Sequence, residues 1–264
     1  MSKVGAQLSV VIPMYNEIRA LPTLIEQLTR QFPTAETEIF LVDDGSTDDT
    51  PGLAVHLTKG DDRFEVLHLP KNLGKGAALR AGIARTTADT VLFMDADLST
   101  SLDDLDAFLE QLKSFDIVIG SRAVAGSVVS RSNTLRSLMG GSFNVLMRLS
   151  TGLNVRDSQC GFKAFRGDVA RLIFKLSEND RFTFDPEILR IGVALGYSIS
   201  EVPVTWVAGD HSAIRPVRDS VRAALDLIPL RFRTRRRRIQ DLASRTIVPT
   251  PVALAQKNEH ENLG

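Results

Sequence analysis

Residues 90–98 have the sequence Thr-Val-Leu-Phe-Met-Asp-Ala-Asp-Leu, in which an apolar run ends at two acidic residues. A short, nearly continuous apolar run is typical of a strand buried on both faces of a parallel sheet. Similar runs recur along the first half of the chain, and segments of helical period such as 74–85 separate them. This alternation predicts an α/β fold with a mainly parallel, Rossmann-like sheet and flanking helices in a single domain. The predicted strands are residues 8–12, 38–42, 64–69, 90–94 and 116–120.

Polar clusters follow four of these predicted strands. The carboxyl ends of parallel strands meet at one edge of a sheet, where ligands bind in open α/β folds. We therefore expect the clusters to form one site. Their residues are 13–17, 43–49, 72–75 and 95–99.

Asp95 and Asp97 are the strongest candidates within that site. Two carboxylates at the end of a buried strand can turn toward a shared cation. Hard oxygen ligands suit Mg²⁺ or Mn²⁺, and such ions complete their coordination with waters and substrate phosphates. A solvated acidic turn is the competing interpretation, because Asp-x-Asp is a common tripeptide.

The other clusters offer less specific signals. Asp44 can accept hydrogen bonds from a ribose or a base, whereas Ser46 or Thr47 would merely cap the next helix. Residues 72–76 lack the full spacing of a phosphate-binding Walker loop, which argues against a nucleotide hydrolase of that type. Lys75 and the helix N-terminus beside it remain candidates for facing an anionic ligand.

Charge is balanced overall but not along the chain. Lys plus Arg equals Asp plus Glu at 32 each, so no general attraction to nucleic acid is expected. Residues 206–238 contain nine arginines and three aspartates, a local balance of 9 − 3 = +6. Apolar residues recur at helical spacing over 216–232, which predicts a basic amphipathic helix. Residues 233–264 are expected to form a basic segment, with a disordered tail after Gln240.

Membrane contact, if any, is expected to be peripheral. Cys160 is the single cysteine, and no apolar stretch approaches the roughly 18–20 residues that span a bilayer. The early apolar run at residues 8–12 is too short for a signal peptide. We expect a cytoplasmic protein. Its basic helix would then lie on the cytoplasmic face of an anionic membrane, or would simply be a core-packing helix with solvated charges.

The ordered motifs of the first half resemble family 2 glycosyltransferases of the GT-A fold. The second half is similar to the branch that includes dolichyl-phosphate glucosyltransferases and bacterial polyprenyl-phosphate enzymes. Beyond residue 120 the pattern predicts helices over 133–149 and 185–195, and strands over 161–165 and 199–206. The resemblance rests on Val11-Ile12-Pro13-x-Tyr15-Asn16-Glu17, residues 42–48, 72–76, 95–97, 120–122, 131–132, 157–163, 184–189 and 201–206.

This resemblance implies a donor half at residues 8–120 and an acceptor half at 121–232, within a catalytic domain of residues 1–232. It implies an inverting hexosyltransferase that moves glucose from UDP-glucose onto a polyprenyl phosphate, with Mg²⁺ or Mn²⁺. The acceptor phosphate would face Arg122 and Arg131, with Asp157 as base or orienting group, although a helix or turn cap explains Asp157 equally well. The nucleotide-sugar and metal sites would comprise Pro13, Tyr15, Asn16, Glu17, Asp44, Lys75, Asp95, Ala96 and Asp97.

Two other functions remain open from the residues. A family 2 enzyme could instead glycosylate a polysaccharide, a protein or a small metabolite. A non-catalytic nucleotide-sugar-binding protein is the alternative from another class, although the intact pair Asp95 and Asp97 favours an enzyme.

Overall fold

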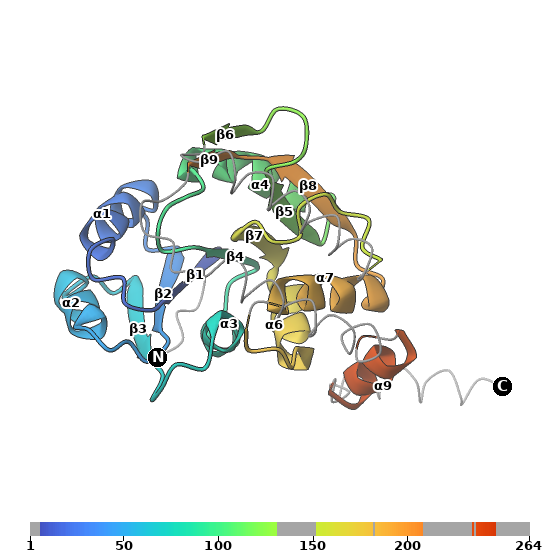
Figure 1. Ribbon diagram of the computed structural model, residues 1–264, viewed down its shortest axis with the longest axis horizontal. Helices are drawn as coiled ribbons and strands as arrows, with labels where there is room; N and C mark the ends of the chain where they lie inside the picture. Colours follow the sequence, from blue (N-terminus) through green and yellow to red (C-terminus); the bar gives the residue numbers. More distant parts are fainter. Residues whose placement is uncertain (1–5, 131–151, 182, 208–233, 235, 247–264) are drawn as a thin grey trace, which may run out of the picture.

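The computed structural model describes residues 6–130, 152–181, 183–207, 234 and 236–246. Its centre is a seven-stranded sheet with the strand order β3-β2-β1-β4-β7-β5-β8 (Figure 1). The five strands predicted in the donor half are confirmed to within two residues. The strands are β1 (Leu8–Met14), β2 (Thr37–Asp43), β3 (Phe64–His68), β4 (Thr90–Met94), β5 (Ile117–Ser121), β7 (Phe162–Arg166) and β8 (Ile199–Pro203).

One strand breaks the parallel pattern. β7 lies between β4 and β5 and runs antiparallel to both, with Lys163 opposite Phe93 on one side and Ile119 on the other. The remaining neighbours pair in parallel. The prediction of a mainly parallel α/β sheet is therefore confirmed, and β7 ties the donor half to the acceptor half.

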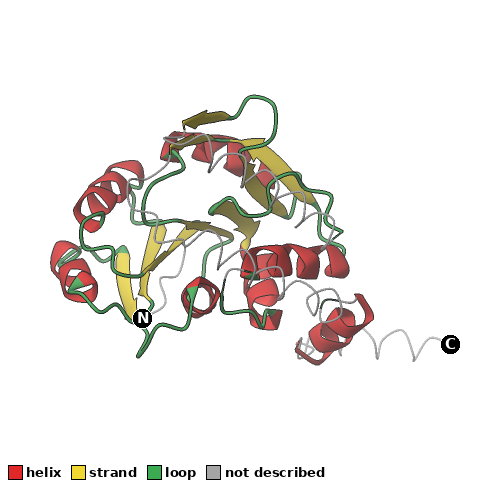
Figure 2. Ribbon diagram, viewed as in Figure 1, coloured by secondary structure: helices red, strands yellow, loops and turns green. Residues whose placement is uncertain are grey.

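Helices cover both faces of the sheet and enclose two apolar cores (Figure 2). Alternate strand residues face opposite cores, as Val10 and Val11 of β1 do. The first core lies under α1 (Leu21–Gln31), α2 (Thr50–Leu57) and α4 (Leu105–Leu112), which follows the short 3-10 helix η1 (Leu102–Asp104). The second lies under α3 (Lys75–Ile83), α6 (Gly167–Leu176), α7 (Phe184–Leu195) and α9 (Arg236–Thr246).

The predicted strand over 199–206 is two strands. β8 ends at Pro203, and β9 (Thr205–Val207) leaves the main sheet to pair in parallel with β6 (Val128–Ser130). Proline lacks the amide hydrogen that a continuing ladder requires. The break thus brings Trp206 over the carboxyl ends of the central strands, where Thr100 bridges to it.

The predicted disorder after Gln240 is wrong for residues 241–246, which continue α9. Ile239 and Ala243 of this helix are buried in the second core, and that contact stabilises a segment whose polar composition had suggested a tail. Residues 131–151, 208–233 and 247–264 lie outside the described residues. They include the predicted helices 133–149 and 216–232 and most of the tail. Within the described part of the chain, no helix combines the length and apolar character needed to cross a membrane.

Candidate active site

The acidic turn that follows β4 lies at the carboxyl edge of the sheet, as predicted. The backbone N–H of Asp95 donates to the carbonyl of Gly161 at 3.1 Å, and its half-exposed carboxylate forms an ion pair with Lys75. Asp97 is exposed, and its Oδ1 accepts the backbone N–H of Ser99 at 3.0 Å. Ala96 between them is buried. The turn thereby presents two carboxylates to one side of the sheet edge.

Glu17 joins this acidic group from the end of β1. Burial, followed by the negative charges of Asp97, Asp95 and Asp48, raises the pKa of Glu17 to about 7. A carboxyl group with this pKa lies close to other carboxylates in a partly dry environment. The clusters after β1 and β4 therefore meet, as the sequence predicted.

Replacing Glu17 with glutamine should change how stability depends on pH. Folded Glu17 retains a proton that the unfolded side chain loses near pH 4.5, so wild-type stability falls as pH rises from about 4.5 to about 7. The amide of the variant cannot titrate. We compare the free energy of unfolding of Glu17→Gln with that of the wild type. After allowance for solvent screening, we expect this difference to favour the variant by about 1–2 kcal/mol more at pH 8 than at pH 5. Thermal melts of metal-free protein at both pH values measure this.

The matched control is Glu26→Gln, which removes an exposed carboxylate of α1. The change in stability of this variant between pH 5 and pH 8 should equal that of the wild type. Identical pH dependence in the Glu17 and Glu26 variants would contradict the placement of Glu17 among the acids.

The side chains of Asp44 and Asn16 stabilise the loops around the site by accepting backbone hydrogen bonds. The two carboxylate oxygens of Asp44 accept the backbone N–H groups of Leu73 and Gly74, both at 2.8 Å. Asn16 adopts a left-handed backbone, with φ of 57°, and its Oδ1 accepts the N–H of Thr47 at 2.8 Å. A carboxylate has about four lone-pair positions, so Asp44 retains capacity for a ligand.

Pro13 and Tyr15 flank the same edge at the end of β1. Pro13 is the penultimate residue of the strand and is partly buried. Tyr15, which is 40% exposed, has an accessible ring. An exposed aromatic ring beside an acidic loop suits stacking on a nucleoside base.

Two alternatives from the sequence are corrected. Ser46 and Thr47 do not cap α2, because Ser46 bonds to Asp43 and Thr47 bonds to Asn16. The N-terminus of α3 is not open to an anion either, since the N–H groups of Gly76 and Ala77 both donate to the carbonyl of Asp180. The local phosphate-loop pattern therefore contributes a lysine to the site rather than a helix end.

The acceptor-side candidates Arg122 and Asp157 form one unit. The Nε of Arg122 donates to Asp157 Oδ2 at 2.6 Å and its Nη2 donates to Oδ1 at 2.9 Å, a bidentate pair. The guanidinium carbon also lies 5.4 Å from the ring centre of Trp206. Burial alone would raise the pKa of Asp157, but Arg122 outweighs it and holds the pKa below the usual value. Arg131, the other predicted cation, lies outside the described residues.

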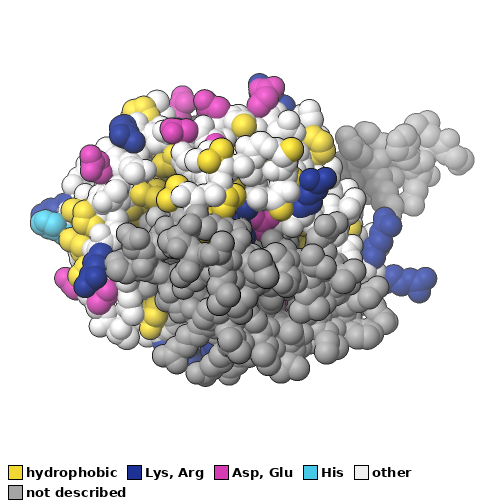
Figure 3. Space-filling view, turned by 45° about the horizontal axis from the view of Figure 1, so that its top comes forward, with side chains coloured by type: hydrophobic (Ala, Val, Ile, Leu, Met, Phe, Trp, Pro, Cys, Tyr) yellow, Lys and Arg dark blue, Asp and Glu magenta, His cyan; other side chains and the backbone are white. Residues whose placement is uncertain are grey.

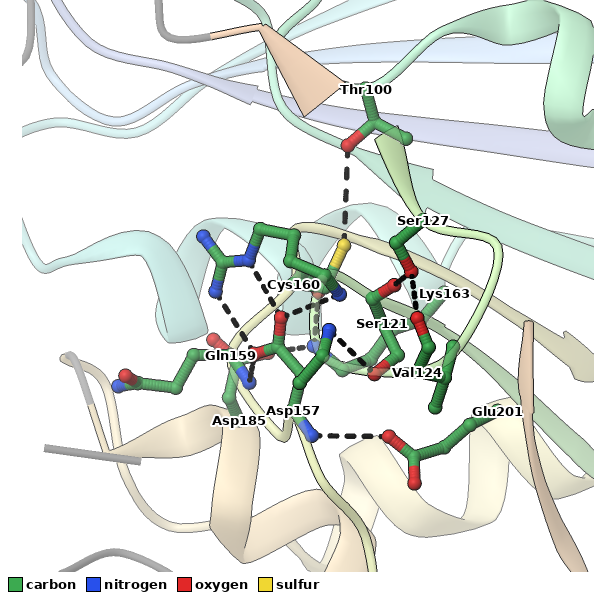
Figure 4. A network of polar contacts seen from close by, with 12 residues as sticks. Thr100, Ser121, Val124, Ser127, Asp157, Gln159, Cys160, Lys163, Asp185 and Glu201 are labelled. Atoms are coloured by element: carbon green, nitrogen blue, oxygen red, sulfur yellow. Dashed lines mark hydrogen bonds and ion pairs between the residues drawn. The ribbon is translucent and has the colours of Figure 1, made fainter. Parts of the chain in front are cut away.

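Behind these pairs lies a buried polar network (Figure 4), one of the two environments that the sequence leaves open for Asp185, and its cation Lys163 was not singled out from the sequence. Lys163 of β7 is fully buried, forms an ion pair with Asp185 of α7, and donates to the carbonyl of Cys160 at 2.6 Å. Glu201 of β8 accepts the backbone N–H of Asp157 at 3.1 Å. One signal was available: Lys163 interrupts the apolar run 162–165, and a charge inside a buried strand requires a partner.

The residues fit a divalent cation, although the set is small. No cluster of three or more metal-binding side chains occurs among the residues that the structure describes. The carboxylate of Asp95 already attracts one positive charge, because it forms an ion pair with the ammonium group of Lys75. Two carboxylates are sufficient for Mg²⁺ or Mn²⁺ when substrate phosphates and waters supply the other ligands. Asp95 and Asp97 are the residues that would hold it.

The described surface carries mixed charge. On the face drawn in Figure 3, Lys and Arg side chains are scattered among Asp and Glu side chains over the described residues. No single-sign field covers the described part of that face, which agrees with the balanced composition.

A comparison with known protein families shows the family to which the chain belongs. Residues 9–174 match the family model described as Glycosyl transferase family 2. The chain is a family 2 glycosyltransferase. The matched residues begin within β1 and end within α6, and hence include both the acidic turn and the Arg122–Asp157 pair.

Relatives of this glycosyltransferase include named enzymes. A dolichyl-phosphate beta-glucosyltransferase of Trichomonas vaginalis is 35% identical over 84% of this chain and 72% of its own length. The Homo sapiens dolichyl-phosphate beta-glucosyltransferase is 32% identical, over 86% and 75% respectively.

Solved structures share the GT-A fold of this glycosyltransferase. Glucosyl-3-phosphoglycerate synthase from Mycobacterium tuberculosis, in complex with Mn²⁺, UDP and glucosyl-3-phosphoglycerate, superposes with a TM-score of 0.63. It is 20% identical, with 87% of this chain and 80% of that chain covered. The same enzyme in complex with Mg²⁺ and UDP gives a TM-score of 0.61 at 19% identity.

Proposed function

We propose that this glycosyltransferase moves glucose from UDP-glucose onto the phosphate of a polyprenyl lipid, with inversion at the anomeric carbon. One arrangement carries the proposal. Burial lowers the pKa of Arg122, but Asp157 and then Cys160 and Asp95 raise it, so Asp95 of the acidic turn lies within electrostatic range of this guanidinium. A metal-bound donor diphosphate and an acceptor phosphate would therefore meet across the end of β7. The names of the relatives support this choice of donor sugar and acceptor.

Donor binding is assigned to the β1, β2 and β4 ends of the sheet. Tyr15, Glu17 and Asp44 would surround the nucleoside, with Pro13 and Asn16 shaping the loop. A divalent ion held by Asp95 and Asp97 would supply Lewis-acid neutralisation of the leaving diphosphate. Lys75 would exchange its present partner Asp95 for a donor phosphate oxygen.

Acceptor activation needs little from the protein. The second pKa of a phosphate monoester is roughly 6, so the nucleophilic oxygen is largely ionised at neutral pH. Its oxygen would form a bond to the anomeric carbon while the bond to the nucleoside diphosphate breaks. We assign Asp157 the task of orienting Arg122, because both of its oxygens are bonded to that side chain. Arg131 would be a second contact for the acceptor phosphate.

A substrate panel tests the proposal. Purified enzyme is assayed with UDP-glucose, other UDP-sugars and GDP-sugars against dolichyl and undecaprenyl phosphate, with Mg²⁺ or Mn²⁺. We expect product from UDP-glucose and a polyprenyl phosphate, lost on chelation. Transfer only to polysaccharide, protein or metabolite acceptors would replace this proposal with the other family 2 function. Metal-dependent UDP binding without transfer to any acceptor would favour a sensor.

We further propose that the enzyme meets its lipid at the cytoplasmic face of an anionic membrane through its C-terminal basic segment. Arg236 and Arg237 are exposed on α9, whereas Arg238 forms an ion pair with Glu178. Each exposed cation near anionic lipid contributes about 1 kcal/mol. The double variant Arg236→Gln/Arg237→Gln should therefore bind vesicles of phosphatidylserine and phosphatidylcholine about thirtyfold more weakly in a flotation assay.

The matched control removes two cations elsewhere. Lys59→Gln/Lys113→Gln makes the same change of charge at exposed positions of the donor half. If both double variants lost vesicle binding to the same extent, α9 would have no specific role. Net charge alone would then explain the loss. A chain lacking residues 213–240 that still floats with vesicles would reject the basic segment altogether.

A further inference from the structure

The carboxylate of Asp95 lies directly against the backbone of Gly161. A Cβ carbon at Gly161 would lie 1.9 Å from Oδ2 of Asp95 and 2.4 Å from its Cγ. Real Cβ contacts shorter than 3.0 Å essentially do not occur, so no residue other than glycine fits while Asp95 keeps this position. The space that a side chain at position 161 would need is occupied by the group expected to bind the metal.

The backbone of Gly161 gives no separate reason for glycine. Its φ is outside the left-handed region, unlike those of Gly45, Gly74 and Gly196. This φ does not by itself require glycine. The contact with Asp95 is therefore the feature that excludes a side chain.

The segment around Gly161 is anchored and cannot easily withdraw. The carbonyl of Cys160 accepts a hydrogen bond from buried Lys163, which Asp185 holds in turn. On the other side, Phe162 is fully buried and packs edge-to-face on Phe108, with ring centres 4.9 Å apart. The carbonyl of Gly161 itself accepts the N–H of Asp95. If a methyl group were added, the Asp95 side chain would be the element that moves.

We propose that Gly161 is a positioning residue for the metal-binding carboxylate. Its lack of a side chain admits the Asp95 carboxylate to the end of β7 and fixes its direction relative to Asp97 and Lys75. This inference rests on the proposed metal-dependent donor binding. Groups that orient metal ligands without touching the metal typically change metal affinity by 10–100-fold when altered.

Gly161→Ala tests the positioning role through metal binding. We expect Mn²⁺ to bind about 10–100-fold more weakly in the presence of saturating UDP, measured by titration calorimetry. In the transfer assay, the Mn²⁺ concentration for half-maximal rate should rise by the same factor, with partial recovery at high Mn²⁺. Gly192→Ala is the control, because its Cβ would press only on the flexible ends of Ile117 and Ile173 in the core. Wild-type Mn²⁺ affinity in Gly161→Ala would overturn the proposal.

A double-mutant cycle covers the case in which Gly161→Ala folds poorly. Asp95→Ala removes the atoms that an alanine at position 161 would strike, so Gly161→Ala should lower the melting temperature far less in that background. An equal loss in both backgrounds would locate the clash elsewhere and overturn the proposal.

The outcomes separate this inference from the proposed function. If the wild type binds Mn²⁺ with UDP but does not glucosylate polyprenyl phosphate, the proposed acceptor is wrong. The Mn²⁺ affinities of the wild type and Gly161→Ala still test the positioning role. A wild type that binds UDP with no contribution from Mn²⁺ would overturn the role of Gly161 as a metal-positioning residue.

Discussion

Asp97→Asn should lower the rate of sugar transfer by about 10²- to 10³-fold with little effect on folding. Loss of one group that stabilises charge on the leaving diphosphate typically costs this much. Because Asp97 is exposed and its hydrogen bond to the N–H of Ser99 is local, an amide can replace it without disturbing the core. Initial rates at saturating UDP-glucose and Mn²⁺, together with a thermal melt, measure both effects.

Asp157→Asn is the informative comparison for Asp97→Asn. If Asp157 acts by orienting Arg122, its amide variant should retain much of kcat while the KM for the acceptor phosphate rises. A base would instead show its loss in kcat. Full turnover in the Asp97 variant would refute the metal assignment, whatever the Asp157 variant does.

Lys163→Met should destabilise the protein by about 3–5 kcal/mol at neutral pH, the usual cost of removing one partner from a buried ion pair. Asp185 would remain buried beside an apolar side chain and the carbonyl of Cys160 would lose its donor. Burial already raises the pKa of Asp185 despite Lys163 and Lys75. Removal of Lys163 should raise it further, so the penalty should grow as pH rises. Denaturant unfolding at pH 5.5 and pH 8 measures it.

The control is the double variant Lys163→Met/Asp185→Leu. Replacing a whole buried ion pair with apolar side chains is often neutral or stabilising, so much of the loss should be recovered. A cost below about 1 kcal/mol for Lys163→Met alone would contradict the burial of an unpaired charge at Asp185.

The donor half was predictable because its chemistry is local. The runs 8–12 and 90–94 are nearly continuously apolar and end at polar clusters, which determines both the strands and the edge where Glu17 and Asp95 meet. Parallel pairing then follows from the intervening helices. Lys75 was expected at the same edge as a contact for an anionic ligand, whereas its ion pair with Asp95 was not predicted.

The acceptor half was less predictable because its key contacts are long-range. Gly161–Phe165 was predicted to be a strand, but an apolar run does not indicate direction, and β7 pairs antiparallel with β4. The stacking of Trp206 on Arg122 depends on the turn after Pro203, and α9 is held by burial of Ile239 rather than by its own composition. None of these contacts leaves a periodic signal in the sequence.

The position of β7 has a consequence for how the chain is synthesised. β4 and β5 emerge from the ribosome before residues 162–166. Until β7 arrives, β4 lacks a partner on one side, and β5 lacks a partner on both sides because β8 is synthesised later still. Unpaired strand edges promote aggregation during synthesis. A fragment that stops before residue 162 should therefore be insoluble even though it contains all the residues that we propose bind the donor. In chimeras of two relatives, the donor half should retain its fold only when it is transferred together with β7.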